Sequence, residues 1–306
     1  MEFGRVQDSL LNGIDFSLKK DPAFNAGILS GKPEENPSVF LGCAMWGVTG
    51  WIGKIYPPGT KEKDYLKYYT RHFNCIELNA THYKIYDPFT IEQWIERTAD
   101  KAFLYCPKMF QGITHKGSLL GKQSLLKEFF NSIEHFGKHL GPVFIQLSDY
   151  FAPARKNELL DFLSTLPKQF KFFLELRHED WFRNESFFQD FVKSVAGLGV
   201  GMVITDVAGR RDCSHMYLTL PSVFVRYVGN GLHPSDYSRL DDWANRAKYW
   251  LDNGLKEFYF LVHTHDEITA PEISVHFIDK LNGLKGFDLK KPKFLEGIGK
   301  QQDLFG

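Results

Sequence analysis

The residues best suited to chemistry are polar side chains that follow short apolar segments of the sequence. Seven predicted strands end on such side chains: Glu77, Asn79, Lys108, Gln146, Glu175, Arg177, His178, Asp206, Arg226 and His263. Glutamate, aspartate and histidine can move protons, whereas lysine and arginine bind carboxylate and phosphate groups. The pattern predicts one polar site that combines acid–base groups with cations.

Each group has an expected role in this site. We expect Glu77 or Glu175 to act as the acid or base, His178 to be the alternative proton carrier, and Asp206 to orient a neighbour. Lys108 and Arg226 are expected to hold an anionic group. The other predicted ligand contacts are Trp46, Asn79, His115, Gln146, Arg177 and His263. A purely structural hydrogen-bond network is the alternative interpretation, because buried polar groups must pair.

A metal site is a further alternative. Side chains of metal-binding type are Glu175, His178, Asp206, His263 and His265. Their spacing matches no metal motif, so no metal ligand is predicted and the cofactor stays unknown. No Gly-x-Ser-x-Gly motif marks a nucleophile, and no Gly-x-Gly-x-x-Gly follows the first predicted strand.

Eight β-rich segments alternate with amphipathic ones and would position these side chains. The predicted strands are 39–45, 75–78, 102–108, 142–147, 170–177, 200–205, 223–228 and 257–263. The predicted helices are 62–73, 91–98, 124–138, 156–166, 185–197, 240–253 and 271–281, with none after strand six. Mostly continuous apolar strands indicate a parallel sheet covered on both faces. We therefore predict an α/β fold, a TIM-type (β/α)8 barrel with outer helices, whose site lies where the strands end.

The ends of the chain lack this alternation. Residues 1–37 are predicted to be an N-terminal extension, partly ordered at best, and 286–306 a C-terminal tail, so that 38–285 form the barrel.

Composition narrows the function classes. The chain has 306 residues, with 37 Lys and Arg against 37 Asp and Glu. This balance makes a nucleic-acid partner unexpected. No stretch has the roughly 20 apolar residues of a membrane span. The four cysteines form no Cys-x-x-Cys pair, which favours a reducing, cytoplasmic location. The oligomeric state is left open.

Ordered motifs carry a resemblance to a known family. They include G-x-x-x-W-G-x-x-G-W-x-G-K-x-Y-P from Gly42 to Pro57, Phe73-x-x-x-Glu77-x-Asn79 and Glu175-x-Arg177-His178. Asp206 and Val225-Arg226 follow in the same order. Over about residues 39–284 the sequence resembles the domain of unknown function 72, or YecE-like, family. The resemblance implies a TIM-type barrel but supplies no reaction.

Three functions therefore stay open. The first is an enzyme, or a ligand binder, that acts on a small phosphate- or carboxylate-bearing compound at the strand ends. The second is a non-catalytic binding or sensing module. The third is a metal-dependent phosphodiesterase or nucleic-acid-processing barrel, which rests on fold analogy alone.

Overall fold

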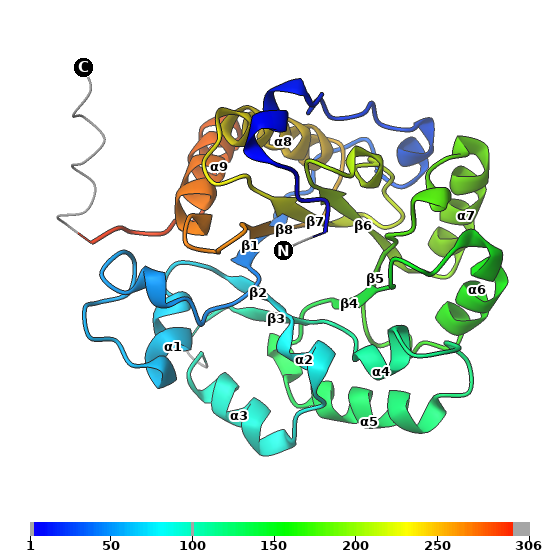
Figure 1. The fold of residues 1–306 in the computed structure, drawn as a ribbon, viewed down its shortest axis with the longest axis horizontal. Coiled ribbons are helices and arrows are strands. Elements are labelled where there is room, and N and C mark those ends of the chain that lie inside the picture. The colour runs from blue at the N-terminus through cyan, green and yellow to red at the C-terminus, as the bar shows by residue number, and fades with distance from the viewer. Residues whose placement is uncertain (1–2, 99–100, 296–306) are drawn as a thin grey trace.

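Eight parallel strands form the centre of the molecule. The computed structural model describes residues 3–98 and 101–295. The strands are β1 (Ser38–Cys43), β2 (Cys75–Leu78), β3 (Leu104–Pro107), β4 (Val143–Gln146), β5 (Phe172–Glu175), β6 (Gly201–Asp206), β7 (Ser222–Val228) and β8 (Glu257–His263). All eight predicted strands are confirmed, and helices lie outside them, as predicted for an α/β fold (Figure 1).

The strands pair into two sheets. Six strands form a curled parallel sheet in the order β1-β8-β7-β6-β5-β4, and β2 pairs with β3 in a parallel sheet of its own. Between β3 and β4 the structure has isolated parallel bridges, one of which joins Lys108 to Phe144. The predicted parallel pairing is thus confirmed, while closure into one eight-stranded barrel stays a prediction.

Side chains connect β1 to β2 where a backbone ladder would otherwise run. Asn74 accepts from the Leu41 nitrogen at 2.7 Å and donates to the Val39 oxygen at 2.9 Å. The Tyr69 hydroxyl accepts from the Cys43 nitrogen at 2.7 Å. A side chain on Gly42 would place its Cβ 2.1 Å from the Cys75 backbone oxygen, so the two strands can approach this closely only with glycine there.

Inward-facing side chains form an apolar layer below a polar one. Phe144, Phe173, Phe224 and Tyr259 are buried in the apolar layer, and the Phe144 and Phe224 rings stack with centroids 5.7 Å apart. Two residues after Phe144, Phe173 and Phe224 the inward position is polar, because side chains alternate along a strand, and on β8 His263 follows the buried Leu261 in the same way. The apolar layer thus supports a polar layer at the carboxyl ends of the strands.

The helices follow the predicted order. They are α1 (Tyr65–Tyr69), α2 (Ala80–Tyr83), α3 (Pro88–Glu96), α4 (Gln111–Thr114), α5 (Gln123–Glu134), α6 (Lys156–Ser164), α7 (Glu185–Gly197), α8 (Pro234–Asp252) and α9 (Ala270–Lys285). The short helices α2 and α4 were not predicted, and α8 begins six residues earlier than expected. Its early start has a local cause, since Pro234 suits the first turn and the His233 side chain accepts from the Ser235 nitrogen. The β6–β7 connection contains only a short 3-10 turn, Arg211–Cys213, which agrees with the absence of a predicted helix.

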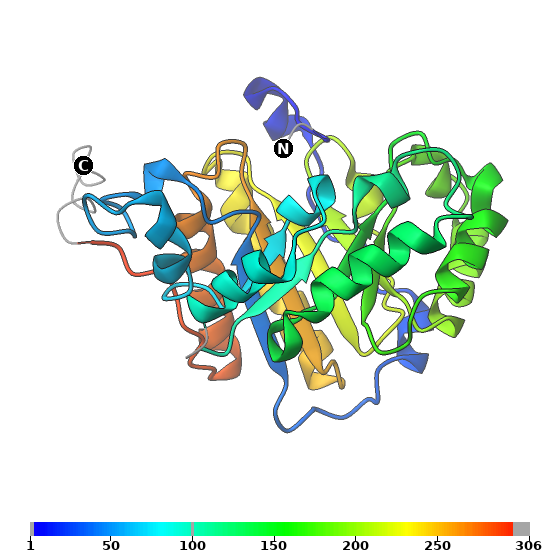
Figure 2. The ribbon, with the colours of Figure 1, turned by 90° about the horizontal axis from the view of Figure 1, so that it is seen from below.

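The segment before β1 runs along the outside of the strands from their carboxyl ends to their amino ends (Figure 2). The Gly209 nitrogen donates to the Gly4 oxygen at 2.8 Å, and Arg246 forms an ion pair with Asp21 at 2.8 Å. Asn25 is buried and binds the Met216 oxygen at 2.9 Å. This extension therefore contacts the β6–β7 connection and α8.

Beyond α9, the Leu295 nitrogen donates to the Lys54 oxygen at 2.9 Å. The rest of the predicted tail, 296–306, lies outside the described residues. Within residues 3–98 and 101–295, no helix is long and apolar enough to cross a membrane.

Candidate functional site

The polar layer unites six of the predicted site residues. They are Glu77, Lys108, Gln146, Glu175, Arg226 and His263, and each is at most 7% exposed. Neighbouring strands hold them at matching levels, because Gln146 pairs in register with Glu175 and Thr205 with Arg226. The structure brings these six strand-end residues together, and their chemical roles stay predictions.

Arg226 lies at the centre of this layer and binds two carboxylates. Its Nε and Nη2 donate to Glu77 at 2.8 and 2.9 Å. Its Nη1 donates to both oxygens of Glu175 at 3.1 and 3.0 Å. Below it, the Phe144 ring centroid lies 4.9 Å from the guanidinium carbon. Since its donors are occupied by carboxylates, Arg226 organises the site, and the expectation that it holds an anionic ligand directly is not supported by this geometry.

Both glutamates are ionised in this environment. Burial raises the pKa of each carboxyl, but the Arg226 charge together with the smaller contributions of neighbouring charges and hydrogen bonds outweighs it and lowers both pKa values. The pKa of Glu77 lies well below its usual value, with His263 contributing, and that of Glu175 falls to about 2, with Arg177 contributing. Neither carboxylate is therefore a strong base at neutral pH as long as Arg226 holds it.

Gln146 connects Glu175 to Lys108. The Gln146 Nε2 donates to Glu175 at 2.8 Å, which leaves its Oε1 to accept from the Lys108 amine at 2.8 Å. Burial and the Arg226 charge lower the pKa of Lys108 to about 8. No carboxylate forms an ion pair with this amine in the part of the chain that the structure describes. Lys108 is thus a buried amine near its titration point.

Two members of the site were missed from the sequence. The Thr205 hydroxyl donates to Glu175 at 3.1 Å. Glu267, in the loop after β8, lies 3.8 Å from His263 Nδ1, and His263 Nε2 contacts Glu77 at 3.0 Å. Burial raises the pKa of Glu267, and its backbone adopts a left-handed φ of 59°. The run His-Thr-His-Asp-Glu after strand eight was the available signal for Glu267.

Asp206 is not part of this layer. Its side chain lies on the outer face of β6, where it accepts from Arg239 and, at 2.7 Å, from the Trp243 indole of α8. Arg211 also binds it. Asp206, expected to orient a neighbour within the polar site, therefore lies outside the polar layer, because Thr205 occupies the inward position of that strand end.

The other predicted residues lie at the rim or apart. Arg177 is 14% exposed and its Nε contacts Glu175 at 3.3 Å. Asn79 donates to Glu77 at 3.0 Å and lines, with Trp46, a separate cavity of about 220 Å³. His115 is exposed, whereas His178 caps the turn Glu179–Trp181 through the Asp180 nitrogen and joins no member of the polar layer by a described hydrogen bond.

The residues considered for a metal do not converge. No group of three or more His, Cys, Asp and Glu side chains within 3–98 and 101–295 is placed to hold a metal ion. Asp206 is excluded from such a group by its outward direction, and Glu175 is already held by Arg226.

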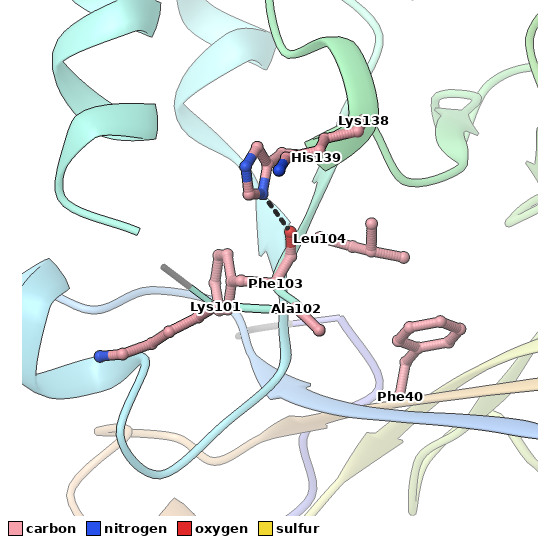
Figure 3. Close-up of a pocket in the computed structure, with 7 residues that line it drawn as sticks. All are labelled: Phe40, Lys101, Ala102, Phe103, Leu104, Lys138 and His139. Atoms are coloured by element: carbon pink, nitrogen blue, oxygen red, sulfur yellow. Dashed lines mark hydrogen bonds between the residues drawn. The ribbon is translucent and has the colours of Figure 1, made fainter. Parts of the chain in front are cut away.

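A larger cavity, of about 500 Å³, lies at the opposite end of β3 (Figure 3). Its walls are mostly apolar and include Phe40, Phe103 and Leu104. The Lys101 amine points away from these rings, and His139 binds the Phe103 oxygen at 2.9 Å. Because this cavity lacks converging charged groups, the polar layer is the better candidate for chemistry.

Comparison with known proteins agrees with this architecture. The family model described as "Protein of unknown function DUF72" matches residues 40–294. The chain belongs to the DUF72 family. Its polar layer and the side chains that join β1 to β2 all lie within the matched region.

Individual relatives are similar to this chain over half or more of their own length. The UPF0759 protein YecE of Escherichia coli K12 is 27% identical over 253 residues, which cover 77% of this chain and 89% of that protein. YunF of Bacillus subtilis is 28% identical over 145 residues, 44% of this chain and 51% of YunF.

A crystal structure of a DUF72 protein from Enterococcus faecalis V583 aligns with a TM-score of 0.65 at 17% identity, over 84% of this chain and 100% of that one. A DUF72 protein from Thermotoga maritima gives 0.58 at 18% identity, over 81% and 99%. These likenesses support the fold.

Proposed function

We propose that the polar layer binds a small anionic compound that carries a phosphate or carboxylate group, at the carboxyl ends of the strands. The supporting observation is a pair of cations, Lys108 and Arg177, whose donors are not all taken up by the carboxylates of the layer. Lys108, Arg177 and Arg226 face the two carboxylates, Glu77 and Glu175. Since Arg226 is occupied by both carboxylates, Lys108 and Arg177 are the cations with binding capacity left for a ligand.

Enzymatic turnover is the favoured form of this function. Glu267, a carboxyl of raised pKa, contacts His263. From His263, hydrogen bonds of Arg226, Glu175 and Gln146 lead to Lys108, an amine of lowered pKa. Groups whose pKa values are moved toward neutrality are typical of acid–base sites. A binding or sensing module remains the alternative. Replacing Glu175 by Gln separates them, because an enzyme would keep ligand binding and lose turnover.

Thermal unfolding with candidate anions tests the proposal. Inorganic phosphate, sugar phosphates and small carboxylates are added to the full-length protein. A ligand at about 100 times its Kd should raise Tm by roughly 4–6 °C. Lys108→Met and Arg177→Gln should each abolish the rise, whereas Arg183→Gln should keep it, since Arg183 is 65% exposed and makes only surface ion pairs. Absence of any shift across the three classes would contradict the proposal.

Two finer features belong to the same proposal. We take the strands to close into an eight-stranded barrel, supported by the Lys108–Phe144 bridge and by the Asn74 and Tyr69 hydrogen bonds. A cytoplasmic location is supported by four free cysteines, all buried.

A further inference from the structure

Lys108 occupies an environment that disfavours a charged amine. The residue is only 7% exposed, and the described residues offer it no carboxylate partner. An ammonium group removed from water without a counter-ion is unstable, so it readily releases its proton. The amine is nevertheless held in one place, because the Gln146 Oε1 accepts from it at 2.8 Å.

The neighbouring cations strengthen this effect. Burial is the main cause that lowers the pKa of Lys108 to about 8, and the charges of Arg226 and Arg177 act in the same direction. Glu77 and Glu175 oppose it, and the single positive charge of Arg226, which pairs with both, offsets part of their negative charge. A lysine that is desolvated and flanked by cations is a nucleophile toward carbonyl carbon.

The residues around Lys108 also define the side from which a carbonyl compound can approach the amine and a group that can bind its carboxylate. The Phe144 ring lies 5.6 Å below the Lys108 amine and blocks approach from the apolar layer. Arg177, at the rim, contacts Glu175 through Nε at 3.3 Å. Its two Nη atoms have no hydrogen-bond partner in residues 3–98 and 101–295. The guanidinium at the rim can thus bind a carboxylate, and the buried amine can attack a carbonyl carbon.

From this arrangement, and resting on the proposed anion site, we infer that Lys108 forms an imine with the carbonyl carbon of a small aldehyde or 2-oxo acid whose carboxylate binds Arg177. The neutral amine attacks the carbonyl carbon and forms a carbinolamine. The C–O bond then breaks as the C=N bond forms. The carbonyl oxygen leaves as water with both hydrogens of the amine, so no oxidant or reductant is needed.

Reductive trapping tests this inference on the full-length protein. Glyoxylate is a small probe with both functional groups, and cyanoborohydride converts an imine on lysine to carboxymethyl-lysine. At pH 7 an amine of pKa about 8 is neutral roughly 200 times more often than an ordinary lysine. Peptide mapping by mass spectrometry should therefore find Lys108 modified first. The initial rate should rise about 50-fold from pH 6 to pH 8 and then level off, since it follows the neutral fraction.

Two variants and a second probe make the test decisive. Lys108→Arg should lose the fast modification, and Lys116→Arg, which changes an exposed lysine in the loop after β3, should keep it. Modification of surface lysines with Lys108 spared in the wild-type protein would overturn the inference, whatever the folding of the variants.

Glycolate, which has the carboxylate but no carbonyl, separates the imine at Lys108 from the proposed anion site. If glycolate raises Tm but glyoxylate does not modify Lys108, the imine is wrong and the anion site stands. If glyoxylate modifies Lys108 but glycolate does not bind, the imine stands without the anion site.

Discussion

Arg226 on β7 binds Glu77 on β2 through two hydrogen bonds, Nε to Oε2 at 2.8 Å and Nη2 to Oε1 at 2.9 Å. Both side chains are at most 2% exposed. A two-point contact of this kind fixes the guanidinium plane as well as its position. Because Glu77 belongs to the two-stranded sheet and Arg226 to the six-stranded one, the pair connects the two sheets across the interior.

Removing Arg226 should therefore be strongly destabilising. Arg226→Met leaves Glu77 and Glu175 buried without their counter-ion. We expect the free energy of unfolding to fall by about 3–5 kcal/mol. Urea denaturation at pH 7 measures this loss. The control Arg183→Met removes only exposed ion pairs and should change the free energy of unfolding by less than about 1 kcal/mol. Equal effects of the two substitutions would refute the structural role given to Arg226.

Acid should weaken the protein through the same carboxylates. The folded pKa of Glu175 is about 2, below its ordinary 4.5, so folding favours the ionised form. The stability that this group contributes, about 3 kcal/mol, is complete above pH 5 and is lost as pH falls toward 2. Glu77 acts in the same direction. Urea midpoints measured from pH 6 to pH 3 should fall steeply in the wild-type protein and less steeply in Glu175→Gln.

Much of this site could be predicted from the sequence because two simple rules apply. Apolar strands that alternate with helices indicate parallel strands whose carboxyl ends meet, and Glu175 and Arg177, two residues apart, must share a face. The rules do not say which face is inward at a strand's last residue. Thr205 and Asp206 are adjacent, and the structure turns the less conspicuous threonine toward Glu175.

A substitution of Asp206 tests whether its side chain points away from the polar layer while that of Thr205 points into it. Asp206→Asn weakens the charged contacts with Arg239 and Arg211 on the outer face of β6. We expect a loss of about 2–4 kcal/mol in the free energy of unfolding, because the buried Arg239 guanidinium loses one of its two carboxylate partners, Asp206, and keeps only Asp236. Affinity for an anion in the polar layer should stay within about twofold at a temperature where the variant is folded. Asp190→Asn, at a side chain 68% exposed, is the control that should alter neither quantity. A selective loss of anion affinity in Asp206→Asn would show that Asp206 takes part in anion binding after all.

The sequence alone does not tell which residues of the family motifs take part in chemistry and which support the fold. Gly42 begins the first motif, yet it serves, together with Tyr69, the contact between β1 and β2. Trp51 is fully buried, and its indole donates to the Glu267 oxygen at 2.9 Å, which holds the loop after β8. These roles depend on contacts between residues far apart in the chain, and no local pattern encodes them. The path of the N-terminal extension could not be predicted from the sequence either, because it too depends on contacts between residues far apart in the chain.

That extension leads to a final prediction, at the rim of the site. The Phe3 ring centroid lies 4.3 Å from the guanidinium carbon of Arg177 and 5.2 Å from that of Arg210. Phe3 thus covers one face of the cation proposed to bind the ligand carboxylate. A cation–π contact of this kind contributes on the order of 1 kcal/mol, and an anion that repositions Arg177 must overcome it.

Phe3→Ala should therefore tighten anion binding about fivefold, the factor that corresponds to roughly 1 kcal/mol. Isothermal titration with the anion that gives the largest thermal shift measures this change. Phe3→Leu keeps apolar bulk without the ring and should show the same direction, which separates loss of the cation–π contact from loss of packing. Phe89→Ala, at a ring 67% exposed on α3, should leave the affinity unchanged. Weaker binding in Phe3→Ala would mean that the extension completes the site, because its aromatic ring would then orient Arg177 for the ligand and not compete with it.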